Sequence, residues 1–405
     1  MKQKNNLLGW FGLLAVLVVT LVVLLVLLTT IPGPGTYTGP ANLTAALAEQ
    51  RSLLLESGKT ASLNINETLL EEGVTFTSSD PKVATVDASG VVTAVGKGSA
   101  LITVADPDET VLCGVIVDGQ GSMIDVTGMS AKVLFSDIML HAQTEIQGMA
   151  VDTVNNAVYL SQGYGASAYV PLNSDIMISK VALVDGVWQR DSWMRFSGSG
   201  KGSMAMDIVD NKPCLWLESG GDFIGYGKTV SVVEWEDYGY GLDSYGQTFE
   251  PVGPVGTVTV SADPENNLVM VYDRNEKCYL LYDREDILAG NTEPEYLHKI
   301  ECVANQTPEN GRDDSKGRYN ASIRGFAIRD GYIYQLSGSA CMYLSVFDMD
   351  GKLQYCRELE VVEGLSNPAA ASLAFGADGC LYLAVNTNEN ANLYYANVWK
   401  LEEVK

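Results

Sequence analysis

Five segments of the chain share one pattern: an apolar strand, a turn rich in Asp, Asn and Gly, and a second apolar strand. They begin at Met149, Met206, Val260, Phe326 and Leu373, which places them 47 to 66 residues apart. Each segment is typical of a β-hairpin. A unit of several strands that recurs about every 50 residues is typical of a propeller blade. Five copies therefore predict a five-bladed β-propeller over residues 124–405.

The end of the chain carries a strand pattern without a hairpin of its own. Residues 395–404, "YANVWKLEEV", follow the fifth hairpin, and residues 131–140, "AKVLFSDIML", precede the first. We expect these two segments to pair in one shared blade, because closing the ring in this way removes an exposed sheet edge.

An aspartate stands in or beside each repeated turn. The five are Asp152, Asp210, Asp263, Asp330 and Asp378. Short polar side chains bond to their own backbone in turns and tolerate left-handed dihedrals. A turn-forming role is therefore favoured over a carboxylate cluster for catalysis or calcium.

Charge and cysteine content exclude several classes of partner. The chain has 26 basic and 50 acidic residues and a net charge of -24, whereas nucleic-acid binding requires clustered Lys and Arg. The seven cysteines form no C-x-x-C pair, so no zinc site or disulfide framework is indicated, although Cys341 and Cys356 could pair. We expect no nucleic acid, no metal and no cofactor.

The first residues predict a membrane anchor. Residues 7–29 contain no charge, and at about 1.5 Å per residue a helix of this length reaches roughly 34 Å, enough to cross a bilayer. No small-x-small cleavage site follows. Lys2 and Lys4 precede the segment, which places a tail of residues 1–6 in the cytoplasm and the later domains outside the cell. Residues 30–49, with "IPGPGTYTGP", predict a stiff linker.

Residues 50–120 alternate apolar and polar positions between turns, which predicts a small antiparallel β-sandwich. The stretch "FTSSDPKVATVDASGVVTAVGKGSALITV", from Phe76 to Val104, resembles the bacterial immunoglobulin-like group 2 domain. Phe76 stands where that family usually has Trp, a change that keeps the apolar volume. The resemblance implies a surface module, either a stalk or a direct receptor-binding domain.

The segments after it, among them "IQGMAVDTVNNAVYLSQ" and "IRGFAIRDGYIYQLSG", resemble the helveticin J-like family from about Val126 to Leu401. The resemblance implies a five-bladed propeller in a surface or secreted protein. Two positions depart from the family pattern. Lys201 in "GSGKGSM" replaces the usual His, and "AAASL" (Ala369 to Leu373) replaces an acidic motif.

Catalytic motifs are scarce. His141 and His298 are the only histidines, and neither has the spacing of a Ser-His-Asp or Cys-His mechanism. We therefore predict no catalytic residue and no enzyme. Hydrolysis of a glycan remains the alternative, because it requires only two carboxylates and the chain has fifty acidic residues.

Binding has better candidates. The starts of the inner strands line one mouth of a propeller channel, so donors and acceptors are expected to converge there: Gln147, Lys201, Ser203, Arg324 and Ser372. An insert rich in glycine adds rings suited to a sugar face or a protein partner, or else to packing between blades: Tyr226, Trp235, Tyr238, Tyr240 and Tyr245.

Together these features predict an all-β protein with an N-terminal transmembrane helix, an Ig-like sandwich and a five-bladed propeller. The expected function is that of a membrane-anchored, extracellular binding protein of a Gram-positive bacterium. Its partner would be a cell-wall or host glycan or a surface protein. A glycoside hydrolase and a bacteriocin-like antagonist are the alternatives.

Overall fold

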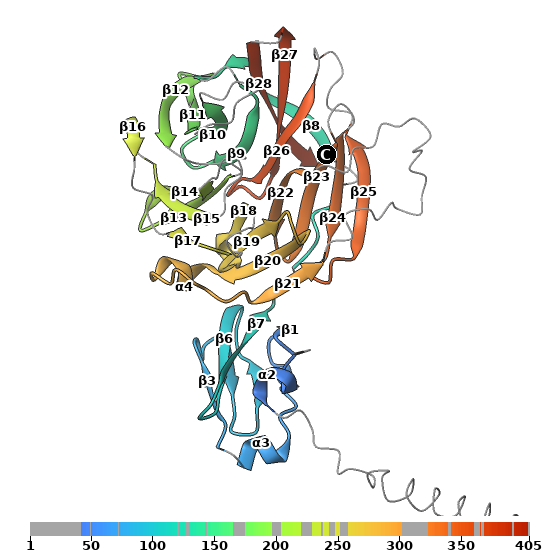
Figure 1. The fold of residues 1–405 in the computed structure, drawn as a ribbon. Coiled ribbons are helices and arrows are strands. Elements are labelled where there is room, and N and C mark those ends of the chain that lie inside the picture. The colour runs from blue at the N-terminus through green and yellow to red at the C-terminus, as the bar shows by residue number, and fades with distance from the viewer. Residues whose placement is uncertain are drawn as a thin grey trace, which may run out of the picture.

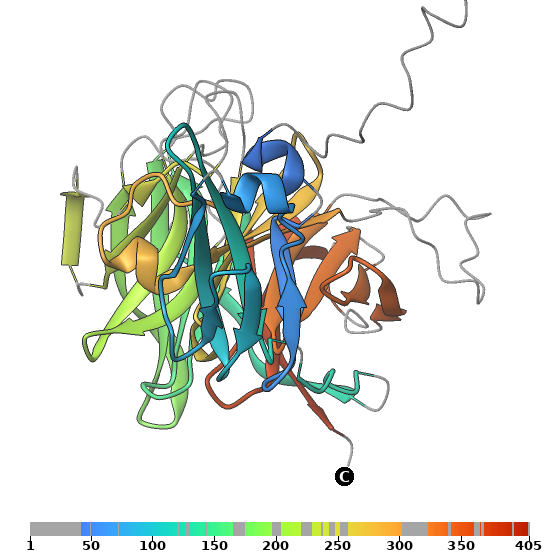
Figure 2. The same cartoon turned by 90° about the horizontal axis from the view of Figure 1, so that it is seen from below.

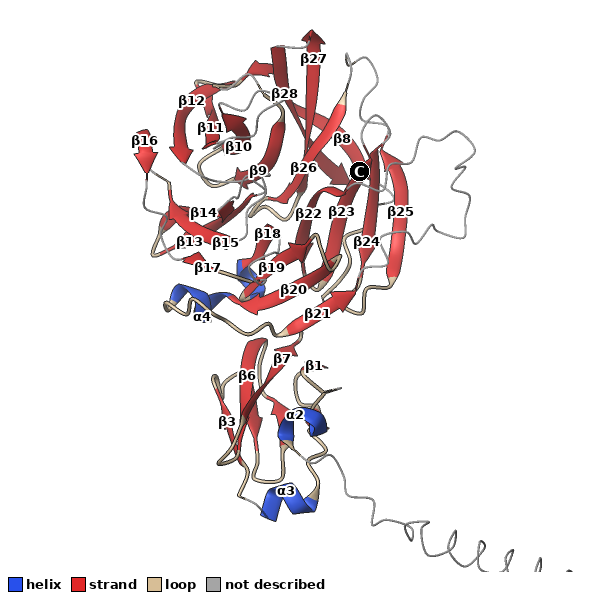
Figure 3. Cartoon of the chain, viewed as in Figure 1, coloured by secondary structure: helices blue, strands red, loops and turns tan. Residues whose placement is uncertain are grey.

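The computed structural model describes most of the chain from Asn42 to Glu403. The described residues are 42–48, 50–71, 73–119, 121–126, 129–141, 144–164, 175–196, 204–219, 229–235, 238–242, 248–251, 258–301, 323–338, 342–359, 365, 368–390 and 393–403. Strands dominate these residues, and Figure 3 shows only short helices among them. The all-β prediction is therefore confirmed.

The N-terminal domain is a sandwich of two small sheets with two short helices. One sheet has the order β1-β7-β6-β3 and the other β2-β5-β4. The elements are α2 (Leu43–Ala46), β1 (Ser52–Leu55), β2 (Thr60–Ser62), α3 (Glu67–Glu71), β3 (Thr75–Ser78), β4 (Ala84–Val86), β5 (Val91–Ala94), β6 (Gly98–Ala105) and β7 (Thr110–Val117). Alternate residues of β5 and β6 are buried, as a sheet with one face on a core requires.

Five further sheets form the blades of the propeller. Blade 1 consists of β9 (Ile146–Asp152), β10 (Ala157–Tyr164), β11 (Asp175–Val184), β12 (Val187–Phe196) and β16 (Tyr238–Leu242). Blade 2 consists of β13 (Met204–Val209), β14 (Lys212–Ser219), β15 (Thr229–Glu234) and β17 (Thr248–Phe249). Blade 3 consists of β18 (Val258–Asp263), β19 (Leu268–Asp273), β20 (Cys278–Asp283) and β21 (His298–Glu301), with η1 (Pro264–Asn266) and α4 (Arg284–Leu288) in its connections.

The last two blades follow the same order. Blade 4 consists of β22 (Ile323–Arg329), β23 (Tyr332–Gly338), β24 (Met342–Phe347) and β25 (Leu353–Leu359). Blade 5 consists of β26 (Ala369–Phe375), β27 (Leu381–Asn390), β28 (Leu393–Glu403) and β8 (Met129–Met139). Strand β8 comes from the start of the domain and pairs antiparallel with β28, so the predicted shared blade is confirmed.

The core of the propeller lies between blades. Each of five buried apolar clusters draws its side chains from two neighbouring blades, and the fifth joins blade 5 to blade 1. Side chains of a strand alternate between its two faces, so every blade contributes one set to each neighbour. Large fully buried side chains fill these clusters, among them Trp216, Tyr159 and Tyr334.

Three of the repeated turns use their aspartate as a turn former. Asp210 and Asp330 have φ angles of 51° and 49°, in the left-handed region that Asp and Asn tolerate better than most residues. The side chain of Asp152 instead accepts hydrogen bonds from the backbone N–H groups of Val154 and Asn155, at 3.0 and 2.9 Å.

The sandwich domain lies against blade 3 (Figure 1), and Figure 2 views the molecule from the side of this domain. Ile116 of β7 is buried in the cluster that joins blades 3 and 4. Ser52 at the start of β1 hydrogen-bonds to the Nδ1 atom of His298 at 2.7 Å.

Among the residues that the structure describes, no helix is long and apolar enough to cross a membrane. This finding contradicts the prediction of a single-pass membrane protein with extracellular domains. The segment on which that prediction rested, residues 7–29, lies outside the described residues, as do residues 1–6 and the linker up to residue 41.

Candidate functional site

The propeller channel has two ends that differ in which part of each blade they expose. At one end lie the turns between the first and second strands of the blades, and we call this the hairpin end. At the other end the inner strands β9, β13, β18, β22 and β26 begin, and we call this the start end. The predicted binding residues belong to the start end or to the insert of residues 225–249, which contributes strands to blades 1 and 2.

Three of the five residues predicted at the start end are described. Gln147 of β9 is partly exposed, and Arg324 of β22 is exposed, with its Nε atom donating to the carbonyl of Gly338 at 3.0 Å. Ser372 of β26 is 4% exposed, and its hydroxyl accepts a hydrogen bond from the backbone N–H of Met149 at 3.1 Å. The three residues lie on the inner strands of blades 1, 4 and 5, and Ser372 hydrogen-bonds across from blade 5 to blade 1. Lys201 and Ser203 lie outside the described residues.

One predicted ring of the aromatic insert, Trp235, has a described environment, and it is packed between blades. Trp235 is 7% exposed, and its ring meets that of Tyr159 edge to face at 4.7 Å between blades 1 and 2. Tyr238 and Tyr240 belong to β16, which runs parallel to β12 at the outer edge of blade 1. Tyr226 and Tyr245 lie outside the described residues. The position of Trp235 favours the packing role over the binding role.

The hairpin end carries a cavity of about 210 Å³ that residues from all five blades line. We call it the hairpin mouth. The charged and aromatic residues in its wall are Asp152, Asp207, Asp263, Glu265, Arg329 and Phe375.

Equivalent positions of the five blades supply most of these side chains. The strand register pairs the last or near-last residue of each inner strand with the first or an early residue of the second strand: Asp152↔Ala157, Asp207↔Cys214, Asp263↔Leu268, Arg329↔Tyr332 and Phe375↔Leu381. Three consecutive blades thus present an aspartate, the fourth an arginine and the fifth a phenylalanine. The mouth is therefore acidic on one side and has a cation and a ring on the other.

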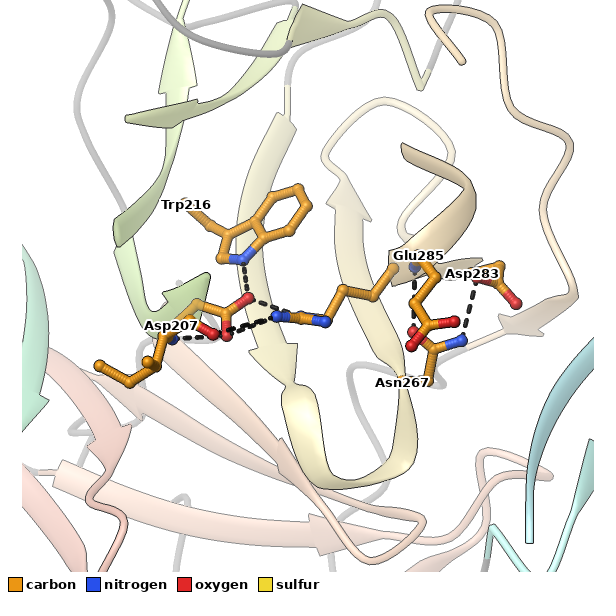
Figure 4. A network of polar contacts seen from close by, with 7 residues as sticks. Asp207, Trp216, Asn267, Asp283 and Glu285 are labelled. Carbon is orange, nitrogen blue, oxygen red and sulfur yellow. Dashed lines mark hydrogen bonds and ion pairs between the residues drawn. The ribbon is translucent and has the colours of Figure 1, made fainter. Parts of the chain in front are cut away.

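Asp207 is fully engaged by its neighbours (Figure 4). Arg284, the first residue of α4, donates from Nε at 2.6 Å and from Nη2 at 3.0 Å, which makes a two-pronged ion pair. The indole Nε1 of Trp216 donates at 2.8 Å and the backbone N–H of Ile208 at 2.7 Å. The carboxylate side chain is completely buried, so this network holds Asp207 in one orientation.

Asp152 and Asp263 have different surroundings. The side-chain Nδ2 of Asn155 donates to Asp152 at 2.7 Å, in addition to the two backbone N–H donors of the turn. Burial raises the pKa of the Asp263 carboxyl above its usual range, although hydrogen bonds from the Asn266 side chain and the Asp330 N–H act in the opposite direction. The mouth thus combines a carboxylate with three N–H donors and a carboxyl that burial pushes toward its protonated form.

A larger groove of about 510 Å³ continues from the mouth between blades 1 and 5 and shares Val151, Asp152, Thr153, Val154 and Ala377 with it. Its other polar and aromatic lining residues include Lys132, Trp188, Asp378, Tyr382 and Lys400.

Two lysines stand side by side in this groove. Lys132 and Lys400 are direct partners across β8 and β28, so their side chains share one face of blade 5. The Lys400 ammonium pairs with Asp378 at 2.9 Å. Burial, the largest influence, raises the pKa of Asp378, but hydrogen bonds from Lys400, the Cys380 N–H and Tyr382 together lower it. The groove therefore offers ammonium groups and flat rings within one open space.

The sequence pattern predicts binding residues at the start end and does not single out Asp207, Glu265 or Arg329. A signal was present, since "MAVD", "MAMD" and "VSAD" each end in the mouth aspartate of their blade. No group of three or more His, Cys, Asp and Glu residues arranged to hold a metal ion occurs within the described part of the chain.

Comparison with known proteins supports both domains as folds. A family model described as the intimin immunoglobulin-like domain matches residues 71–108. No curated protein matches the chain.

Solved structures with a similar fold include the tail fiber of a Staphylococcus aureus phage, at 13% identity and a TM-score of 0.51, over 68% of this chain and 53% of that one. The chain thus spans about half the length of the tail fiber. A GH43_1 enzyme from Xanthomonas citri follows at 11% identity and a TM-score of 0.42, over 68% of this chain and 91% of that one. An arabinanase of Bacillus subtilis has 10% identity and a TM-score of 0.40, over 67% of this chain and 97% of that one.

These structures contradict the prediction that the protein is not an enzyme, because enzymes are among the proteins to which the chain is similar. At such low identity the likeness concerns the fold alone. The chain thus has an Ig-like domain, matched by the family model over residues 71–108, and a propeller-like fold after it.

Proposed function

We propose that the protein acts on carbohydrate, holding a glycan in the groove between blades 1 and 5 and hydrolysing a glycosidic bond at the hairpin mouth. The reaction class is taken from the similar enzymes, and a cell-wall or host glycan is the expected source of substrate. The finer resemblances, to group 2 bacterial Ig-like domains and to helveticin J-like propellers, belong to this proposal.

The observation that carries the proposal is the contrast between the carboxyls of one cavity. Glycoside hydrolysis requires one carboxylic acid that protonates the leaving oxygen and one carboxylate that acts as base or nucleophile. The pKa of Asp263 is raised by burial, which suits the acid. Asp152 accepts three N–H donors, which hold its oxygens in one orientation, as the second role requires. Asp207 is assigned a structural role, because Arg284 and Trp216 donate hydrogen bonds to its carboxylate.

The groove supplies what a sugar chain needs beside the reacting bond. The rings of Trp188 and Tyr382 line it, and aromatic rings with a polar edge pack against sugar faces. Lys132 and Lys400 add ammonium groups. Acidic as well as neutral oligosaccharides therefore belong in a substrate screen.

The test measures bound glycan and released reducing sugar in the same samples. The purified protein is incubated with neutral arabino- and xylo-oligosaccharides, with acidic oligogalacturonides and with cell walls. We expect Asp263→Asn and Asp152→Asn each to reduce release by about 100-fold or more, because a positioned acid or base contributes on that order. Binding should change much less.

The matched control is Asp185→Asn, in an exposed turn between β11 and β12 where the left-handed backbone suits both residues. It should leave release unchanged. A general acid must be protonated, so release by the native protein should fall as pH rises through the raised pKa of Asp263. Binding without release on every substrate would contradict the hydrolytic role.

A further inference from the structure

The sandwich domain meets the propeller through close backbone packing. A Cβ atom added to Gly114 of β7 would lie 2.1 Å from the carbonyl oxygen of Leu297. Only glycine therefore allows the backbone of β7 to approach the backbone at Leu297 this closely. Beside it Ile116 is 2% exposed and packs among Leu268 and Leu281 of blade 3. The sandwich domain is therefore docked on blade 3 and not merely tethered to it.

A buried polar contact lies within the same interface. The hydroxyl of Ser99, at the start of β6, donates to the Oδ2 atom of Asp283 at 2.8 Å and accepts from the Nδ2 of Asn267 at 3.1 Å. Ser99 is 3% exposed and Asp283 8% exposed. One hydroxyl of the sandwich domain thus connects two residues of blade 3.

These two residues hold the first turn of α4. Asp283 is the N-cap, and its Oδ1 atom accepts from the Asp286 N–H at 3.0 Å and from the Asn267 Nδ2 at 3.0 Å. Asn267 in turn accepts from the backbone N–H of Arg284 at its carbonyl and from that of Glu285 at its side-chain oxygen, at 3.0 and 2.9 Å. Figure 4 shows Asn267, Asp283 and Glu285 grouped at this end of the helix.

Arg284 extends from that turn to the mouth carboxylate Asp207. We propose that the sandwich domain positions Asp207 in the wall of the hairpin mouth, with Ser99 as the positioning residue that acts through Asp283, Asn267 and Arg284. This inference takes the hairpin mouth as the site, as the proposed function does. It gives the sandwich domain a role in that site, because Ser99 would link the orientation of Asp207 to the docking of the sandwich domain.

The test uses an observable that does not depend on activity. The Nε1–H group of Trp216 donates to the Oδ2 atom of Asp207, so its indole signal in the ¹H–¹⁵N spectrum of ¹⁵N-tryptophan-labelled protein reports on that carboxylate. The signal is assigned with Trp216→Phe. We expect Ser99→Ala to shift it by more than its line width and Ser99→Thr, which keeps the hydroxyl, to restore it.

The matched control is Ser57→Ala, whose exposed hydroxyl bonds within the sandwich domain to the carbonyl of Val95. It should not move the signal. A second pair of variants tests the domain interface without changing the hydrogen bonds of Ser99. Gly114→Ala introduces the clash with Leu297, whereas Gly163→Ala of β10 meets nothing within 4 Å. Only Gly114→Ala should shift the Trp216 signal.

An unmoved signal in folded Ser99→Ala and Gly114→Ala proteins would overturn the positioning role. That outcome is independent of hydrolysis, because the spectrum is recorded without substrate. If the signal shifts as expected and no glycan is cleaved, the coupling stands and the proposed reaction does not.

Discussion

Aspartates at equivalent positions of three blades have acquired three different surroundings. Asp152 caps its own turn, Asp207 forms an ion pair with Arg284, and Asp263 is buried beside Asn266 and the Asp330 N–H. The sequence assigns a turn-forming role to Asp152 and Asp263 from the propensity of short polar side chains, but in blade 2 it singles out Asp210 and not Asp207. It does not predict the partners, because Arg284 is 77 residues away from Asp207.

At this scale we expect Asp207→Asn to destabilise the fold strongly. The Arg284 side chain is 13% exposed and the Asp207 side chain fully buried, and breaking a buried pair leaves a charge without compensation. The free energy of unfolding should fall by about 3 kcal/mol, measured by urea denaturation.

The comparison is Glu234→Gln, which breaks the exposed pair with Lys212, whose side chains are 57% and 45% exposed. Solvent screens that pair, so the loss should be much smaller than that of Asp207→Asn. Equal losses in the two variants would refute the structural role assigned to Asp207.

Contacts between residues that are far apart in the sequence also explain where two of the predicted binding residues lie. Trp235 and Ser372 have the residue types of a ligand site, but Trp235 packs on Tyr159 and Ser372 bonds to the backbone of Met149. Both contacts cross from one blade to the next. Local patterns identify the strand on which a residue lies, and they leave open which neighbouring blade its side chain meets.

Elements were more predictable than contacts. The hairpins and the β8–β28 pairing follow from alternation and from the requirement that sheet edges be covered. The return of β16 to blade 1 was not predicted, because a parallel pair has no turn signal in the sequence.

Inner strands pack so closely that one glycine is required between blades 4 and 5. A Cβ atom on Gly325 of β22 would lie 2.8 Å from the backbone nitrogen of Leu373 and 2.9 Å from the Cα of Ser372, both in β26. Gly325→Ala should therefore lower the free energy of unfolding by about 1 to 3 kcal/mol, as overpacking does.

Gly163→Ala in β10 provides the matched strand position, since an added methyl group meets nothing there. Its effect should be within about 0.5 kcal/mol of zero. Thermal or urea unfolding measures the stability of the two variants. An equal change in the free energy of unfolding would show that β22 and β26 can move apart without loss of stability.

At the scale of the whole molecule, the sequence predicts two domains and says little about their contact. Ile116, Leu101 and Gly114 look like ordinary strand residues, and only the structure shows Ile116 and Leu101 beside the core of blade 3 and Gly114 against Leu297. These residues dock the sandwich domain on the propeller.

The docked interface should make stability depend on pH. His298 accepts from Ser52 at Nδ1 and donates to the Met349 carbonyl at 2.8 Å, and burial lowers its pKa, although the Met349 contact and Asp350 oppose the shift. Below about pH 6.5 the unfolded chain binds the proton more readily than the folded one. Stability from this group is therefore present above that pH and is lost as pH falls toward the folded pKa.

His141 acts in the same direction, with its pKa lowered to about 4 by burial and by Arg190. The variant His298→Gln isolates the interface, because glutamine keeps a donor and an acceptor but does not titrate. Urea unfolding at a series of pH values from about 7 to about 5 should show a shallower decline for His298→Gln than for the native protein. Parallel declines would exclude His298 as a source of the pH dependence.

The shared blade has a consequence for how the protein is made. Strand β8 is synthesised before every other propeller strand, yet its partner β28 is synthesised last. During translation the early edge stays open while four blades accumulate behind it. A nascent chain can therefore gain blades one at a time but cannot seal the ring, and an unpaired edge is available to chaperones, or to another nascent chain, until β28 leaves the ribosome.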